Sequence, residues 1–149
     1  MDWYKKAEEM AEETPTDWHN SIRIEQIVAG RTLHDVDGIE YMAPFRNPQM
    51  PIYEVDVRKT DDRWKMDLPG FYLEEGYSDD RKEVFENWLQ HGIPIEVPEI
   101  YIDKNGVVSF INGRHRFSVI RDMGKSKTAM NVEFEDPYLL KFIDGRRIG

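Results

Sequence analysis

A five-residue run, Asn112-Gly113-Arg114-His115-Arg116, combines residue types that are suited to handling a phosphate group. Glycine lets an anion approach the main chain, and arginine presents a planar fork that can hold phosphate at two points. Histidine can donate a hydrogen bond or move a proton near neutral pH. The residue types therefore indicate phosphate binding, with acid–base chemistry as a second capacity.

The sequence around this run predicts where it lies in the fold. An apolar stretch at residues 107–111 precedes it, and Phe117, Ile120 and Met123 follow it at helical spacing up to Gly124. A strand is therefore expected to end, and a helix to begin, at the run. Helix N-termini present unpaired N–H groups and a partial positive charge, so this position favours an anion.

A structural interpretation of the same residues stands beside the functional one. Arg114 and Arg116 would then point in different directions and pair with Asp122 or with the acidic helix after Tyr77. His115 would be a buried side chain with its hydrogen bonds satisfied. Spacing alone does not separate the two interpretations.

The remaining elements predict an α+β fold. The Asn105-Gly106 step favours a hairpin between strands at 95–102 and 107–111, and Pro98 implies an edge, a bulge or an early strand position. Further strands are expected at 52–57 and 127–134, and helices at 2–13, 78–90, 114–123 and 137–143. Residues 17–49 predict irregular structure, and residues 59–76 predict a loop or insertion.

The run from Tyr101 to Gly124, YIDKNGVVSFINGRHRFSVIRDMG, resembles the core motif of the ParB/sulfiredoxin superfamily. In that family the turn commonly reads Asp-Gly-x-His-Arg, Gly-Glu-Arg-Arg or Gly-Cys-His-Arg, and Gly113, His115 and Arg116 match it. The resemblance covers roughly residues 52–134. It implies a ParB/sulfiredoxin-like domain at 52–149, with residues 1–51 as an N-terminal extension packed on it.

The resemblance also implies a site and a function. Asn112, Gly113, Arg114, His115 and Arg116 would bind the phosphates of a nucleoside triphosphate, ATP or CTP, together with Mg²⁺. Stand-alone members of the family include kinases, nucleotide hydrolases and nucleases, so the expected activity is that of a phosphotransferase, NTPase or nuclease. His115, Arg116 and Glu99 are the expected catalytic residues.

Departures from the family pattern narrow these expectations. The chain has no cysteine and carries Arg114 where a sulfiredoxin has its cysteine, which excludes sulfinic acid reduction. Only 25 residues follow Gly124, so a helix-turn-helix domain and sequence-specific DNA binding are not expected. The position often occupied by aspartate is the neutral Asn112, so the resemblance does not carry a metal-binding or base role onto it.

Other residues offer weaker candidates. The segment from His34 to Asp37 with Glu40 could hold a divalent cation or be a solvated loop. A carboxylate near the first core strand, from Glu54, Asp56, Asp61 and Asp62, could serve as a base or hold magnesium. Glu96 and Glu99 frame Pro98 and are expected beside the turn, and Glu99 is the preferred single carboxylate. Phe110 and Phe117 flank the run, where they could stack on a base or anchor the core.

Charge supports a second class of function. The chain of 149 residues has a formal charge of -9, divided as -5 over residues 1–50, -7 over 51–100 and +3 over 101–149. This balance disfavours general nucleic-acid coating and polybasic membrane binding, and it leaves a DNA-mimicking or acidic protein-interaction role as the alternative. A charged N-terminal segment and the lack of long apolar runs predict a cytoplasmic protein that does not bind membranes.

Overall fold

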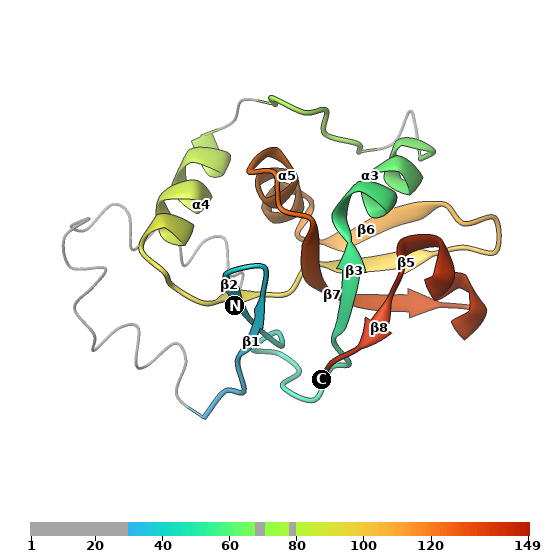
Figure 1. The fold of residues 1–149 in the computed structure, drawn as a ribbon, viewed down its shortest axis with the longest axis horizontal. Helices are drawn as coiled ribbons and strands as arrows, with labels where there is room; N and C mark the ends of the chain where they lie inside the picture. The colour runs from blue at the N-terminus through green and yellow to red at the C-terminus, as the bar shows by residue number, and fades with distance from the viewer. Residues whose placement is uncertain (1–29, 68–70, 78–79) are drawn as a thin grey trace.

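The computed structural model describes residues 30–67, 71–77 and 80–149 and has the predicted α+β class (Figure 1). The predicted helix at 2–13 and the predicted cap at Ser78 and Asp79 lie outside the described residues. Among the described residues, no helix is long and apolar enough to span a membrane.

A five-stranded sheet forms the centre of the molecule, with strand order β6-β5-β7-β3-β8. Strand β7 runs parallel to β5 and antiparallel to β3, while β5 and β6 form the antiparallel hairpin that the Asn105-Gly106 step predicts. Only Gly106 in this turn has a positive φ, at 77°. The strands of this sheet are β3 (Tyr53–Asp56), β5 (Glu99–Ile102), β6 (Val108–Asn112), β7 (Lys127–Phe134) and β8 (Arg146–Arg147).

A second sheet of three strands corrects the prediction of irregular structure at 17–49. Strands β1 (His34–Val36) and β2 (Ile39–Met42) form an antiparallel hairpin, and β2 pairs in parallel with β4 (Ile95–Glu96). Pro98 separates β4 from β5, so the predicted strand at 95–102 is split between the two sheets. Residues before position 52 therefore share a sheet with the chain after it.

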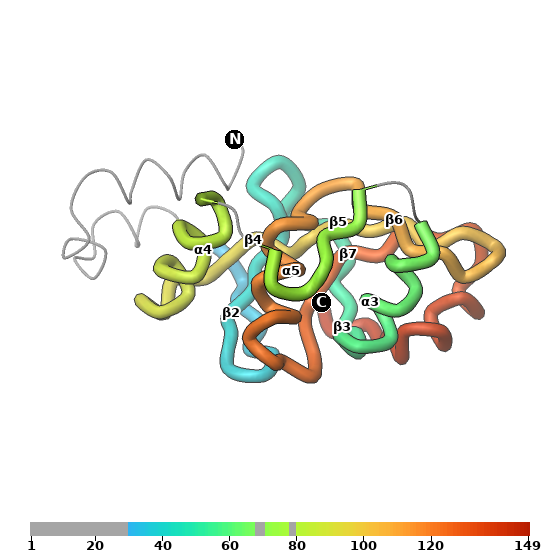
Figure 2. The backbone as a smooth tube through the Cα atoms, turned by 90° about the horizontal axis from the view of Figure 1, so that it is seen from above, coloured from blue at the N-terminus to red at the C-terminus, as the bar shows by residue number. Residues whose placement is uncertain are grey.

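Three helices lie along one side of the sheets, with α5 (Arg114–Asp122) between α3 (Val57–Lys65) and α4 (Asp80–Gln90) (Figures 1 and 2). Helix α4, α5 and the 3₁₀ helix η2 (Pro137–Ile143) match predicted helices. Helix α3 replaces the loop predicted from residue 59. Its N-cap is Asp56, whose carboxylate accepts from the Lys59 amide at 2.8 Å.

Helix α5 brings the run 112–116 to the core. Its apolar face, which includes Phe117, Val119 and Ile120, is fully buried. The Trp64 ring of α3 contacts the Phe110 and Phe117 rings at centroid distances of 4.5 and 5.8 Å. Phe117 is therefore a buried core aromatic and Phe110 a partly buried one, and together they fix α5 against the hairpin on both sides of the strand-to-helix turn.

Candidate phosphate-binding turn

Gly113 joins β6 to α5 in a conformation that favours glycine. Its φ is +87°, in the left-handed region. A Cβ at this position would lie 2.6 Å from Nη2 of Arg116 and 2.9 Å from Cα of Pro98. The close approach of Pro98 and the backbone angle both make a side chain here costly.

Among the described residues, no side chain caps the N-terminus of α5. Gly113 is the N-cap residue and provides no capping side chain, and the first turn contains no acidic residue. The first backbone bond of the helix runs from the Phe117 amide to the Gly113 carbonyl at 3.0 Å. The amides of residues 114–116 precede that bond, so they are the donors that an anion would meet.

Arg116 lies beneath the turn. The residue is 2% exposed, and its Nη2 is 3.5 Å from the carbonyl oxygen of Val97. The same nitrogen limits the space at Gly113. Its buried guanidinium therefore places positive charge directly under the first turn of α5, in surroundings where charge is poorly screened.

Arg114 and His115 face a strap made of residues 71–77. The Arg114 guanidinium lies 4.8 Å from the centroid of the exposed Phe71 ring, and the His115 and Tyr77 rings are 6.2 Å apart. The alternative expectation paired Arg114 and Arg116 with Asp122 or with the acidic helix after Tyr77. Among the described residues, Asp122 instead forms ion pairs with Arg121 and Lys82.

A buried ion pair fixes the strap and joins α3 to α5. The Arg121 and Asp61 side chains are fully buried, with Nη1 3.0 Å from Oδ1. Arg121 also donates to the carbonyl of Leu73 in the strap, and the Tyr72 hydroxyl donates to Asp61 at 3.0 Å. Burial, with the Asp61 charge next in effect, raises the pKa of Tyr72, so its hydroxyl keeps the proton that it donates.

Glu99 lies beside the turn, but it is held by partners. It is 1% exposed, faces Asn112 across the β5–β6 ladder and accepts from the Asn112 side-chain amide at 3.4 Å. Its other carboxylate oxygen accepts from the half-exposed Arg46 side chain. Sequence reasoning missed Arg46, because it lies 53 residues from Glu99 in a proline-containing loop that shows no periodic pattern.

A second buried carboxylate anchors the same loop. Glu96 is 5% exposed, and its Oε1 accepts from the Phe45 amide at 2.7 Å. Burial raises the pKa of Glu96, although the bond from Phe45 and the charge of Arg116 oppose this effect. Glu96 and Glu99 together hold residues 45 and 46 against β4 and the start of β5.

The other predicted carboxylates have structural contacts. Glu54 pairs with Arg146 at 3.2 Å, and Asp56 caps α3. In the β1–β2 turn, Asp37 accepts from the Ser126 amide at 2.8 Å. Within the described ranges, no three His, Asp or Glu side chains gather as a metal site.

The geometry brings an uncapped helix N-terminus, a buried arginine, a second arginine, a histidine and a buried carboxylate to one turn. This set can bind an oxyanion through backbone amides and neutralise its charge. Comparison of the chain with protein-family models, with curated proteins and with solved structures finds no match.

Proposed function

We propose that this protein binds nucleotide phosphates at residues 112–116 and uses them in phosphoryl transfer or phosphodiester hydrolysis. The observation that carries the proposal is the uncapped N-terminus of α5 at a left-handed glycine, with Arg116 buried beneath it. An anion at this position would accept from the first-turn amides and lie close to the Arg116 guanidinium. The similarity of the turn to ParB/sulfiredoxin proteins supports the same ligand.

Each residue has a distinct part in the proposed chemistry. The amides that follow Gly113 cradle a phosphate, while Arg114 and Arg116 neutralise its negative charge. His115 polarises the transferred group or acts as an acid or base. Glu99 is the carboxylate next to Asn112, and Arg46 holds one of its oxygens. We assign Arg46 a positioning role.

The residues at the turn would hold Mg²⁺ only together with a bound nucleotide. Mg²⁺ in such sites is commonly bound by phosphate oxygens, waters and one or two carboxylates. Glu99 is the carboxylate that faces Asn112, but its two oxygens already accept from Arg46 and Asn112, so the nucleotide phosphates and water would supply most of the ligands. Bound there, the ion would neutralise charge that develops on the phosphate oxygens.

Thermal unfolding tests the proposal. Purified protein would be melted with ATP, CTP, GTP, ADP and inorganic phosphate, each with and without Mg²⁺. A nucleotide at 100 times its dissociation constant stabilises by about 2.7 kcal/mol, which raises Tm measurably. We expect one nucleotide to produce this shift.

Two variants and a control identify the turn as the site. Arg116→Ala removes the buried charge, and Arg114→Gln tests the turn without disturbing a buried side chain. Lys104→Gln, at an exposed position in the β5–β6 turn, removes a charge elsewhere. The nucleotide shift should be lost in the first two variants and kept in the control. No shift at millimolar nucleotide would contradict the proposal and favour the acidic protein-interaction role, for which Arg116→Ala should leave partner binding nearly intact.

A further inference from the structure

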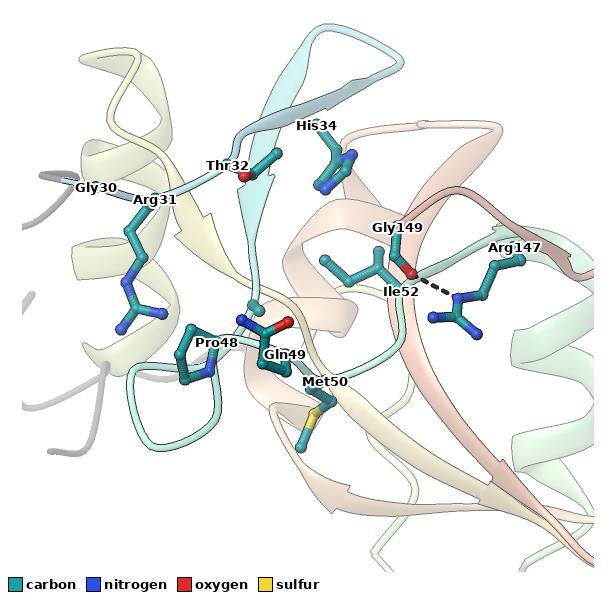
Figure 3. A pocket seen from close by; sticks show the side chains of 11 residues that line it. Gly30, Arg31, Thr32, His34, Pro48, Gln49, Met50, Ile52, Arg147 and Gly149 are labelled. Atoms are coloured by element: carbon teal, nitrogen blue, oxygen red, sulfur yellow. Dashed lines mark hydrogen bonds between the residues drawn. The ribbon is translucent and has the colours of Figure 1, made fainter.

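A pocket of about 310 Å³ lies away from the turn, between residues 30–34, the loop 43–52 and the chain at 147–149 (Figure 3). This volume equals roughly ten water molecules and is at the lower end of the range for ligand sites. Ala43, Met50 and Ile52 supply apolar surface. The pocket therefore has the size and mixed lining of a site for a small molecule.

The charge of this lining differs from that of the chain. Arg31, His34 and Arg147 line the pocket, and no aspartate or glutamate side chain is among the described residues that form it. The whole chain carries a formal charge of -9. Arg147 already donates to a main-chain oxygen of Gly149 at 2.6 Å, so Arg31 is the arginine of this lining that can favour an anion.

Several polar side chains that line the pocket can still donate or accept hydrogen bonds. Figure 3 shows the His34 ring and the Gln49 amide directed toward the space below Thr32. Within the part of the chain that the structure describes, no hydrogen bond engages the side chains of Thr32, His34 or Gln49. Polar groups that line a cavity in this way are satisfied by water or by a ligand.

The neighbouring groups are held in place by contacts of their own. The Arg31 guanidinium lies 4.6 Å from the Phe45 ring centroid and donates to the Pro44 carbonyl at 3.3 Å, which leaves most of its N–H groups available. The His34 ring packs so closely on Gly149 that a Cβ there would lie 2.7 Å from Nε2. The Gly149 carbonyl accepts from Ile52 and Arg147, at 3.1 and 2.6 Å.

We propose that this pocket binds a small oxyanion, a carboxylate or phosphate compound of about the volume of ten water molecules. Arg31 supplies the positive charge, and Thr32, His34 and Gln49 supply directional hydrogen bonds. This site is separate from the turn at 112–116, and its existence does not depend on the proposed nucleotide chemistry.

An NMR titration tests this assignment at each site separately. ¹⁵N-labelled protein would be titrated with inorganic phosphate and, in a second series, with succinate, at constant ionic strength. We expect saturable shifts of the Thr32, His34, Gln49 and Gly149 amides. Comparison of the two series determines whether the pocket prefers phosphate or carboxylate.

Three variants test whether the amide shifts arise from anion binding in the pocket. Arg31→Gln removes a charge-assisted bond and should weaken binding about tenfold. Thr32→Trp, at an exposed position, should fill the pocket and abolish the shifts without changing charge. Lys104→Gln should leave the affinity unchanged. The proposal is overturned if the pocket amides do not saturate with either anion, or if Thr32→Trp leaves their shifts intact. Shifts confined to residues 113–115 would also overturn it and would support the nucleotide proposal instead.

Discussion

Gly113, Arg114 and Arg116 differ in burial and in contacts, which their residue types alone do not show. Gly113 adopts a positive φ and packs closely against Pro98. Arg116 is a buried positive charge next to Gly113, and Arg114 lies on the exposed ring of Phe71. The sequence motif groups these residues as one phosphate-binding run. The structure separates the buried residue of the run from those that a ligand can reach.

Replacing Gly113 tests the backbone requirement. Gly113→Ala combines a left-handed φ with contacts below 3 Å, so we expect a loss of roughly 3 kcal/mol in unfolding free energy. Gly124→Ala is the matched control, because its φ is +79° and no atom lies within 4 Å of the new Cβ. That control should cost about 1 kcal/mol. Urea unfolding measures both, and equal losses would contradict a steric role for Pro98.

The exposed ring of Phe71 predicts a contact with the nucleobase. Phe71 is 71% exposed beside Arg114, whereas Phe110 and Phe117 are occupied by Trp64. Phe71→Ala should weaken nucleotide binding by about 1 kcal/mol, or roughly fivefold, and leave tripolyphosphate binding unchanged. Isothermal titration calorimetry measures both ligands, with the distant exposed Tyr138→Ala as control. An equal loss for tripolyphosphate would argue against base stacking.

At the scale of elements, the two helices α3 and α5 are joined by charge as well as by apolar packing. The Asp61–Arg121 pair is inaccessible to solvent and also fixes the strap through Tyr72 and Leu73. Removal of Asp61 would take away the fully buried partner of Arg121 and leave it with the ion pair to Asp122, at 3.0 Å. The pair therefore couples the position of the turn to that of α3.

Neutralising Asp61 should be far more costly than neutralising its neighbour. Asp61→Asn should lower the unfolding free energy by about 3 to 5 kcal/mol. Asp62→Asn, at a side chain 60% exposed, should change it by less than about 0.5 kcal/mol. Chemical denaturation of the two variants compares them directly. Similar stability of both variants would show that the buried pair contributes little.

Sequence patterns predicted the elements whose apolar residues are regularly spaced. They missed elements whose buried face includes polar residues. The hairpin of β5 and β6, helix α5 and strand β7 were predicted because their apolar residues repeat. Helix α3 was missed because Thr60 and Asp61 occupy half of its buried face. Strands β1 and β2 are short, and β2 pairs with β4 more than 50 residues away. The motif predicted the turn, but the Arg46–Glu99 contact could come only from tertiary structure.

At the scale of the whole molecule, the two sheets and the loop 43–52 connect the two proposed sites. Residues 45 and 46 contact Glu96 and Glu99 near the turn, while Gln49 and Met50 line the pocket. Burial of these carboxylates therefore contributes to the position of both sites. Burial of Glu96 also makes the stability of the molecule dependent on pH.

The raised pKa of Glu96 determines whether stability rises or falls with pH. Its folded-state pKa is raised by burial, so the folded protein binds the proton more tightly than the unfolded chain. Stability should therefore fall as pH rises from the ordinary value of 4.5 through the raised pKa. Glu96→Gln should be more stable than the parent at neutral pH, with the difference shrinking at pH values below 4.5. Urea unfolding at several pH values measures this, and a constant difference would contradict it.

The most direct test of the central claim is an NMR titration of the turn amides with Mg-ATP and Mg-CTP. We predict that the amides of Gly113, Arg114 and His115 shift saturably with at least one nucleotide, and that Arg114→Gln weakens the response. Lys104→Gln should titrate like the parent protein. Turn amides that stay unmoved at millimolar nucleotide, in a folded protein, would contradict the claim.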